Sequence, residues 1–350
     1  MALFVFGAGA TRGASFVNPD DFACLPPLDR DFFTQLQRVA NPKHQSLVSA
    51  VIKDVVDIFG RNFDVTMETV YTTLEHTIRM LKLTGEKRDY RARDLQQRRD
   101  RLKQAIAVVL EESMTENVSG SSSLRMRTCD FHRQFISAVL LPNDVIITFN
   151  YDCLLDISLK TFGEDKWNAH YGYGFNLGPR GTAVAGHEFW QPPSRATKTN
   201  TVMFFKLHGS LHFFASGSDQ AAPVRLKQRP YTKQAGAGLH FSIIPPEWYK
   251  AYDRGVFSTP WAKASAAIHK AEHVVIIGYS LPPTDLHSTA LFRTSIKNKS
   301  LKSLVVVNPS HETRRRTRSV LQRGVTDNTR VLSFEYFPEF LASKRSLWEV

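Results

Sequence analysis

Short apolar runs along the chain predict buried β-strands. Residues 2–6 form the first run, and a long separation precedes the second, at residues 145–149. Runs of four to six residues, rich in valine and isoleucine, are typical of strands covered on both faces of a parallel sheet. Later runs of this kind occupy residues 202–207, 240–244, 274–277 and 304–307.

Between the first two runs, apolar positions repeat at the spacing of amphipathic helices. Residues 45–59 carry one apolar face, and residues 67–83 and 94–112 repeat the pattern. The polar segment 119–123 then predicts a loop, because Gly and Ser interrupt the helical spacing. A further helix is expected over residues 129–140, where the apolar spacing resumes before Pro142.

Helical patterns return at residues 259–271 and 286–297, and these segments are long enough to connect parallel strands. Residues 163–200 and 215–238 are rich in Gly, Pro and polar residues, which predicts long loops. Strands that alternate with helices indicate an α/β fold. We therefore predict a doubly wound parallel sheet, formed by residues 1–30 and 141–350, with a helical insertion of residues 31–140.

Composition indicates a globular protein. Hydrophobic residues make up 42% of the 350 residues, which is enough for a packed core. We expect no leader peptide, because the N-terminus runs directly into a strand, and no membrane span, because no apolar stretch approaches about 18 residues. The three dispersed cysteines predict no disulfide framework, so a cytoplasmic location is expected.

The chain is strongly basic, with a formal net charge of +12. Lysine and arginine can neutralise phosphates, which raises the question of nucleic-acid binding. The densest basic segments, residues 87–103 and 314–318, have the pattern of exposed helices. We expect them to be solvated faces or a surface for a protein partner, and direct nucleic-acid binding is the less favoured interpretation.

Five short motifs follow predicted strands in a fixed order. They are Phe6-Gly-Ala-Gly-Ala-Thr11, Thr148-Phe-Asn-Tyr-Asp152, Lys206-Leu-His-Gly-Ser210, Gly278-Tyr-Ser-Leu281 and Val307-Asn-Pro309. Ligands of open α/β sheets bind at the carboxyl ends of the strands, where these motifs are expected to lie. In this order the motifs resemble the sirtuin family, and more closely its bacterial sirtuin-like NAD-hydrolase branch than the protein deacetylases. The resemblance implies a sirtuin-like Rossmann fold and NAD as the substrate.

The first motif is a candidate phosphate-binding turn. Glycine lets the backbone approach phosphate oxygens, and the helix that follows exposes N–H groups at its start. The motif departs from the common dinucleotide pattern, because Arg12 stands where the third glycine would fall. A tight strand-to-helix turn without a ligand is the alternative. The candidate NAD-binding residues here are Gly7, Ala8, Gly9, Ala10 and Thr11.

Asn150 and Asp152 are candidate catalytic residues. In the sirtuin pattern the matching Asn holds a water near the nicotinamide ribose, and the matching Asp binds the nicotinamide carboxamide. Cleavage of the glycosidic bond develops positive charge on the ribose, and a neutral amide can orient water without quenching that charge. A turn that caps the following helix is the alternative for these two residues.

His208 is the third candidate catalytic residue, since the resemblance gives it the role of a general base or of a partner for a ribose hydroxyl. His212, close by, is not expected to be catalytic. The resemblance places Gly278 and Ser280 near the phosphates and ribose and Asn308 at the adenosine ribose, where an amide can bond a diol. Ordinary turns at strand ends are the alternative.

The cysteines separate this chain from the deacetylases. Those enzymes hold a structural zinc with two Cys-x-x-Cys pairs, and tetrahedral zinc requires four ligands. Cys24, Cys129 and Cys153 cannot supply four, so we expect no metal. The helical insertion takes the place of the zinc module, and no signature of an acyl-lysine groove is recognisable. Water is therefore the expected acceptor, which predicts hydrolysis of NAD to nicotinamide and ADP-ribose.

The resemblance also implies a biological role. Bacterial relatives of this type act in antiphage defence, where depletion of NAD halts the infected cell in abortive infection. We expect control by homo-oligomerisation or by a partner, such as a hexameric DNA-translocase ATPase of the HerA type or an Argonaute-like protein. Two other functions stay open at this point: an NAD-dependent protein deacylase, and a non-catalytic subunit that binds NAD or ADP-ribose.

Overall fold

The computed structural model describes residues 1–84, 90–119, 124–175, 177, 197–215, 224–226, 242–244, 252–296, 300–343 and 345–348. Most of the predicted loops at 119–123, 163–200 and 215–238 lie outside these residues. Within the described parts of the two long loops, a short helix α8 (Ala169–Gly172) and the strand β8 (Val224–Leu226) were not predicted.

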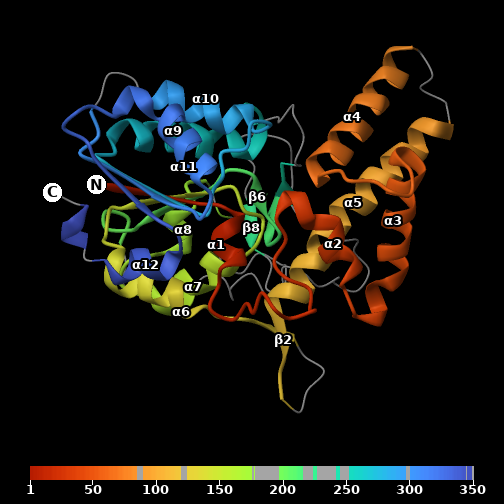
Figure 1. Ribbon diagram of the computed structural model, residues 1–350, viewed down its shortest axis with the longest axis horizontal. Coiled ribbons are helices and arrows are strands. Elements are labelled where there is room, and N and C mark those ends of the chain that lie inside the picture. The colour runs from red at the N-terminus through yellow and green to blue at the C-terminus, as the bar shows by residue number, and fades with distance from the viewer. Residues whose placement is uncertain are drawn as a thin grey trace.

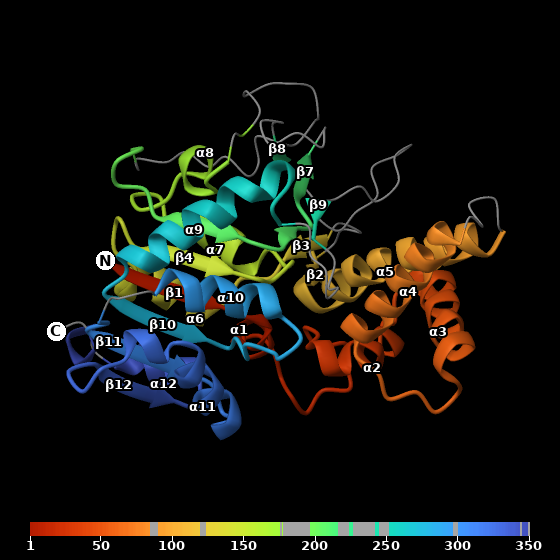
Figure 2. The same cartoon turned by 90° about the horizontal axis from the view of Figure 1, so that it is seen from above.

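Six parallel strands form the central sheet in the order β12-β11-β10-β1-β4-β5 (Figures 1 and 2). The chain moves outward from β1 to β4 and β5 and then crosses to the other side of β1 for β10, β11 and β12. This is the strand order of a doubly wound dinucleotide-binding fold, so the predicted fold class is confirmed. The strands are β1 (Ala2–Phe6), β4 (Val145–Thr148), β5 (Met203–Lys206), β10 (His273–Ile277), β11 (Ser303–Val307) and β12 (Arg330–Phe334).

Helices cover both faces of the sheet, which explains why its inner strands are buried along their whole length and mostly apolar. Figure 1 shows α9 (Ser258–Lys270), α10 (Leu286–Ser295) and α11 (His311–Val320) on one face. The opposite face carries α6 (Asp130–Gln134), α7 (Leu154–Phe162) and α12 (Phe337–Ala342). Phe4 and Phe6 of β1 pack edge-to-face on Phe135, with ring centroids 4.9 and 5.1 Å apart, so part of the core lies between the sheet and the turn that follows α6.

A group of helices projects to one side of the sheet (Figures 1 and 2). It contains α2 (Phe32–Gln37), α3 (Gln45–Phe59), α4 (Met67–Leu83) and α5 (Tyr90–Met114), all within the predicted insertion. The predicted bounds of α3 and α4 are confirmed, and α5 is longer than the expected 94–112. Ion pairs join these helices, as between Arg101 and Asp54 at 2.7 Å.

Two sequence predictions are corrected by the structure. The expected strand at 240–244 does not join the central sheet, and its described part is β9 (Ser242–Ile243), which pairs antiparallel with β6 (Gly209–Ser210). Ser242 is polar and half-buried, which is typical of a short strand pair outside the core and not of a core strand. The expected helix 129–140 is divided into α6 and a π-helical turn at Phe135–Val139.

Further elements were not predicted, among them the hairpin β2 (Thr115–Asn117) with β3 (Leu124–Met126), the strand β7 (Phe213–Ala215), which pairs with β8, and the edge strand β12. The helix expected after the first motif is α1 (Ala8–Arg12). The hairpin extends away from the body of the molecule in Figure 1. Of the helices in the described residues, none is long and apolar enough to cross a membrane.

Candidate active site

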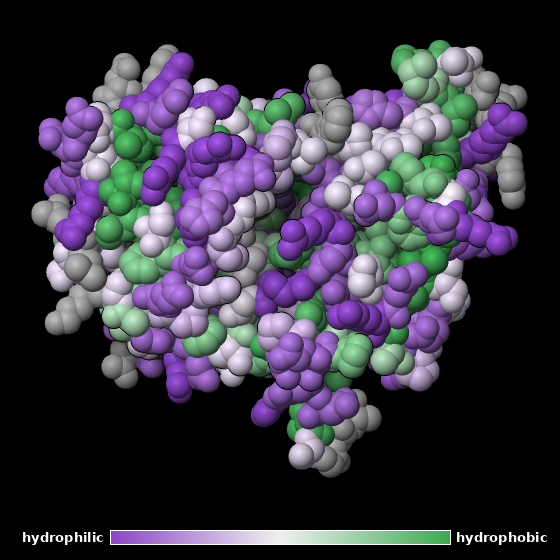
Figure 3. All heavy atoms as spheres, viewed as in Figure 1, coloured by the Kyte–Doolittle hydropathy of each residue, from purple (hydrophilic) through white to green (hydrophobic). Residues whose placement is uncertain are grey.

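The five sequence motifs meet at one edge of the sheet. Because the strands are parallel and in register, their carboxyl ends align, and each motif begins where its strand ends. Figure 3 shows that the surface is hollowed between the sheet and the helices α2 to α5, beside α1. The aligned last residues are Phe6, Thr148, Lys206, Ile277 and Val307.

Glycines bring the loops after β1 and β10 into direct contact at the point where the strand order reverses. The Gly9 N–H donates to the Gly278 carbonyl at 2.9 Å, and the Gly7 N–H donates to the Ile277 carbonyl at 3.0 Å. A Cβ on Gly278 would lie 2.1 Å from the Ala10 nitrogen, and Gly278 has a positive φ of 63°. These positions therefore require glycine for the contact between the two loops, and the phosphate-binding role of the first motif stays a prediction.

A hydrogen-bonded chain joins the first two motifs. The Thr11 hydroxyl donates to Asp152 Oδ2 at 2.9 Å and accepts from the Asn150 amide nitrogen at 3.2 Å. This assignment directs the amide Nδ2 of Asn150 toward Thr11 and leaves its Oδ1 as the acceptor for another group. The sequence predicted Asn150 and Asp152 near each other, and the structure adds Thr11 as the residue that orients both.

Asp152 is buried, and its carboxylate also caps the start of α7. Its Oδ1 accepts the Leu154 N–H at 2.9 Å. Burial raises the pKa of the Asp152 carboxyl, and the positive charge of Lys206 opposes that increase. Asp152 thus has the helix-capping role that was the alternative interpretation, together with its place beside Asn150.

A small cavity lies beneath these residues. Its walls combine two apolar side chains with hydroxyls, an amide, a carboxylate, an imidazole and an ammonium group, so it can accommodate a polar group. It is lined by Phe6, Thr11, His132, Thr148, Asn150, Asp152, Leu155 and Lys206.

His208 lies at the end of β5 and is almost completely buried. Its Nε2 is 3.8 Å from Asp285 Oδ2, and its ring packs against Phe149 with centroids 5.0 Å apart. Asp285 also caps α10 and accepts from the Tyr279 hydroxyl at 2.8 Å. The pairing of His208 with a carboxylate was missed, because nothing local in the sequence connects the two segments.

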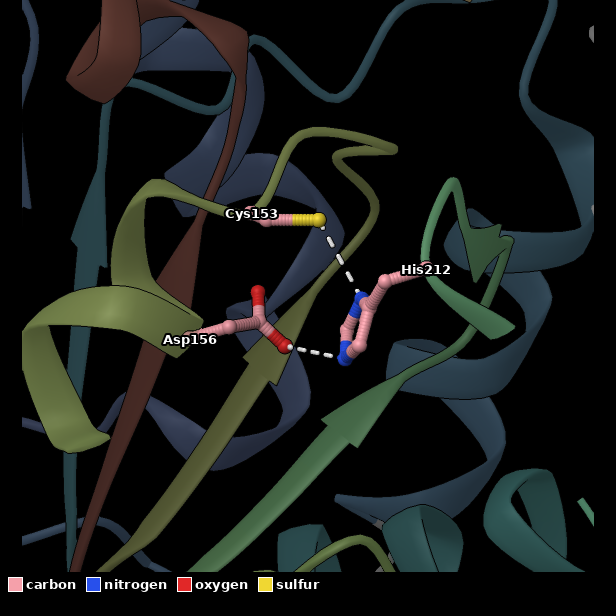
Figure 4. Close-up of side chains that lie close together, drawn as sticks. All are labelled: Cys153, Asp156 and His212. Carbon is pink, nitrogen blue, oxygen red and sulfur yellow. Dashed lines mark hydrogen bonds and ion pairs between the residues drawn. The ribbon is translucent and has the colours of Figure 1, made fainter. Parts of the chain in front are cut away.

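His212 belongs to a separate cluster inside the protein, shown in Figure 4. Its Nδ1 is 3.1 Å from Cys153 Sγ and its Nε2 is 3.4 Å from Asp156 Oδ1. All three residues are fully buried, and burial raises the pKa of the Cys153 thiol, which is therefore neutral. The arrangement has the residue types of a Cys-His-Asp triad, but its burial gives a substrate no access to the sulfur.

A buried ion pair completes this cluster. Lys206 Nζ lies 2.6 Å from Asp156 Oδ2, and it also donates to the backbone carbonyl of Asp152. Burial lowers the pKa of Lys206, but the combined effect of Asp156, Cys153 and Asp152 outweighs burial and raises the pKa above the usual value. Cys153, Asp156 and His212 have the spacing of a metal cluster, but the ammonium of Lys206 already balances the carboxylate. A lysine inside the apolar run 202–207 was the sequence signal for this pair.

Ser280 and Asn308 lie beside α11. Arg316 Nη1 donates to the Ser280 carbonyl at 3.3 Å, and Arg314 Nη1 donates to the Asn308 carbonyl at 2.7 Å. The side chain of Asn308 accepts the Ser310 N–H at 3.0 Å, which forms the turn before the helix. The basic segment 314–318 is thus not uniformly exposed, because Arg314 is buried against the site.

Comparison with known families agrees with this architecture. The model of the SIR2-like domain matches residues 144–326, which is more than half of the chain and includes four of the five motifs completely. No curated protein matches the sequence. Together with the six-stranded parallel sheet, the match shows that the chain belongs to the SIR2-like family, whose domains use NAD.

Proposed function

We propose that this protein hydrolyses NAD to nicotinamide and ADP-ribose. The observation that supports this most is the chain of hydrogen bonds from Asn150 through Thr11 to Asp152, at the sheet edge where the doubly wound fold binds its ligands. This arrangement supplies an oriented neutral amide beside a carboxylate.

The proposed chemistry requires that a water replace nicotinamide at C1′ of the ribose. The glycosidic C–N bond breaks, its electron pair returns to the pyridine ring, and the water oxygen forms the new bond to C1′. Asn150 Oδ1 would accept a hydrogen bond from the water, because its amide nitrogen is directed to Thr11. The water oxygen is then placed for attack, and orientation of this kind supplies much of the rate in such reactions.

His208 would receive a proton in this scheme, either from a ribose hydroxyl or from the attacking water. Asp285, 3.8 Å from its Nε2, would stabilise the imidazolium that forms. The Asp152 carboxylate would accept a hydrogen bond from the nicotinamide carboxamide. The positive charge of Lys206 favours its ionised form against the effect of burial.

The cysteines favour hydrolysis over protein deacylation. Cys24, Cys129 and Cys153 are buried at separate places in the core, so they do not assemble the four ligands of a structural zinc. A subunit that only binds NAD would need the glycine loops and Asn308, but it would have no use for Asn150 and His208 together. These arguments keep the deacylase and the binding subunit as alternatives that an assay can separate.

The proposed biological role is that of an NAD-depleting effector in antiphage defence, held inactive until triggered. Control would come from self-assembly or from a translocase ATPase or Argonaute-like partner. Exposed apolar side chains at the end of α4 support an assembly surface, since Met80 is 58% and Leu83 is 80% exposed. Figure 3 shows apolar surface at this tip.

The test is to identify the products that the purified chain forms from NAD. The assay is run with and without an ATPase encoded beside the protein, and with and without an acetyl-lysine peptide. Release of nicotinamide and free ADP-ribose in equal amounts, without peptide, supports hydrolysis. An acetylated ADP-ribose product that requires the peptide would support a deacylase. Binding of NAD without any cleavage, in every arm, would support the non-catalytic subunit.

A further inference from the structure

The helical insertion contacts a loop of the candidate site through the first turn of α4. Glu68, the acidic residue of this turn, is 6% exposed. Its Oε2 accepts a hydrogen bond from the hydroxyl of Thr284, which is 216 residues away in the loop after β10. Its backbone N–H donates to Asp29 Oδ1 at 3.0 Å. Glu68 lies outside the residues that the family model matches, so the family match does not account for this contact.

Thr284 directly precedes the carboxylate partner of His208. Asp285 Oδ2 is 3.8 Å from His208 Nε2, and the same oxygen accepts from the Tyr279 hydroxyl at 2.8 Å and from the Ser288 hydroxyl at 2.6 Å. A separation of 3.8 Å permits charge attraction but is longer than a hydrogen bond. A small movement of the loop at Thr284 would therefore change the interaction of Asp285 with His208.

Glu68 and Asp285 act on the same buried tyrosines. Burial raises the pKa of Tyr279, and the charges of Asp285 and Glu68 raise it further. Burial also raises the pKa of Tyr151, to which both carboxylates again contribute, and the ring centroid of Tyr151 is 6.3 Å from that of His208. The insertion thus places a second carboxylate among the side chains near His208.

We propose that Glu68 is a positioning residue for the candidate catalytic histidine, because by holding the Thr284 hydroxyl it keeps Asp285 beside His208. This proposal rests on the proposed function, since it assigns the helical insertion a part in the same reaction. Loss of the hydrogen bond would release the loop that leads into α10. Asp285 would then stabilise the imidazolium less, and turnover of NAD would depend on a residue that the insertion supplies.

The test compares the pH titration of the His208 ring by NMR, in the full chain labelled isotopically at histidine. Thr284→Val removes the hydroxyl and no charge, so it separates positioning from the charge of Glu68. Glu68→Ala removes the acceptor, whereas Glu68→Gln keeps an acceptor oxygen. Glu75→Ala is the matched control, because Glu75 lies further along α4 and its carboxylate pairs with Arg99 at 2.7 Å within the insertion. The His208 signal is assigned by its absence in His208→Gln.

The key variant leaves the charged surroundings of His208 in place. Titratable side chains in this region come from the start of α10, the loops after β4 and β10, the first turns of α4 and the 3-10 turn before α2. They are Asp285, Tyr151, Tyr279, Glu68, Tyr71 and Asp29. Because Thr284→Val alters none of them, a changed titration of His208 in this variant would report a movement of Asp285.

We expect the midpoint of the His208 titration to move to lower pH in Thr284→Val and Glu68→Ala, toward its value in Asp285→Asn. The reason is that a nearby negative charge favours the charged imidazolium. Turnover of NAD should fall about tenfold in Thr284→Val and Glu68→Ala, be retained in part in Glu68→Gln and be unchanged in Glu75→Ala.

Three results would overturn the proposal. They are an unchanged midpoint in Thr284→Val, an equal shift in Glu75→Ala, and a loss of turnover in Glu68→Gln as large as that in Glu68→Ala. Because the titration needs no cleavage, a chain that shows the expected shifts but does not hydrolyse NAD would contradict the proposed function alone.

Discussion

The buried ion pair between Lys206 and Asp156 gives the sharpest prediction about stability. Lys206→Met keeps the length and apolar stem of the side chain but leaves the Asp156 carboxylate without its counter-ion, at 0% exposure. Removal of one partner from a buried pair costs about 3–5 kcal/mol of unfolding free energy. We expect a loss of this size at pH 8.

The loss should depend on pH in a defined direction. Burial raises the pKa of Asp156, and removal of Lys206 removes the main effect that lowers it. A carboxyl whose pKa is raised in the folded state contributes stability that is complete below its unfolded pKa, about 3.9, and is lost as the pH rises through the folded pKa. The cost of Lys206→Met should therefore be smaller at pH 5 than at pH 8.

Urea denaturation, followed by tryptophan fluorescence, measures this cost. Lys302→Met is the control, because Lys302 is 55% exposed in a surface pair 3.6 Å from Glu272, and such pairs contribute about 0–1 kcal/mol. Asp156→Asn added to Lys206→Met removes the uncompensated charge and should recover part of the loss. A cost below about 1 kcal/mol for Lys206→Met, or no recovery in the double variant, would refute the reasoning.

Three further predictions follow from the described contacts. Burial raises the pKa of Tyr151, Tyr173 and Tyr279, so the native state keeps protons that the unfolded chain loses above about pH 10. Stability to urea should fall as the pH rises past that value, and less steeply in Tyr173→Phe; an unchanged slope would contradict this. Chelators should leave the melting temperature and any NAD turnover unchanged, and a stoichiometric metal in the purified protein would contradict that expectation. Arg314→Glu should reduce turnover per site, because Arg314 holds the Asn308 carbonyl, whereas the exposed Arg315→Glu should instead weaken assembly measured by light scattering at about physiological salt. Equal turnover in the two arginine variants would contradict the last prediction.

The sequence predicted the inner strands of the sheet well because their patterns are simple. Every residue of Ala2–Phe6 is buried. A short run that is apolar at each position is compatible with few structures in an α/β protein other than a buried strand. The edge strand β12 was missed because it pairs on one side only, so polar residues such as Arg330 and Ser333 interrupt its pattern. The π-helical turn after α6 was missed because helical apolar spacing does not distinguish it from an α-helix.

The positions of the candidate residues at strand ends were predictable from the sequence, and their contacts were not. Asn150, Asp152 and His208 were found as residues at strand ends, where the fold class itself places ligand-binding groups. Their partners lie far away in the chain: Thr11 is 141 residues from Asp152, and Lys206 is 50 residues from Asp156. Pairings over such separations depend on the packing of whole elements, which no local pattern encodes. The same packing shows that His212, chosen as the histidine not expected to be catalytic, lies in the interior.

The central claim is that Asn150 orients the water that cleaves NAD. The most direct test compares the rate of nicotinamide release per chain in the wild type and in Asn150→Ala, at saturating NAD and with the melting temperature of both proteins recorded. The hydrogen-bonded chain through Thr11 predicts a fall of about 100-fold or more with little change in melting temperature, because Asn150 positions a reactant and is only half-buried. Near-normal nicotinamide release by a folded Asn150→Ala variant would contradict the account.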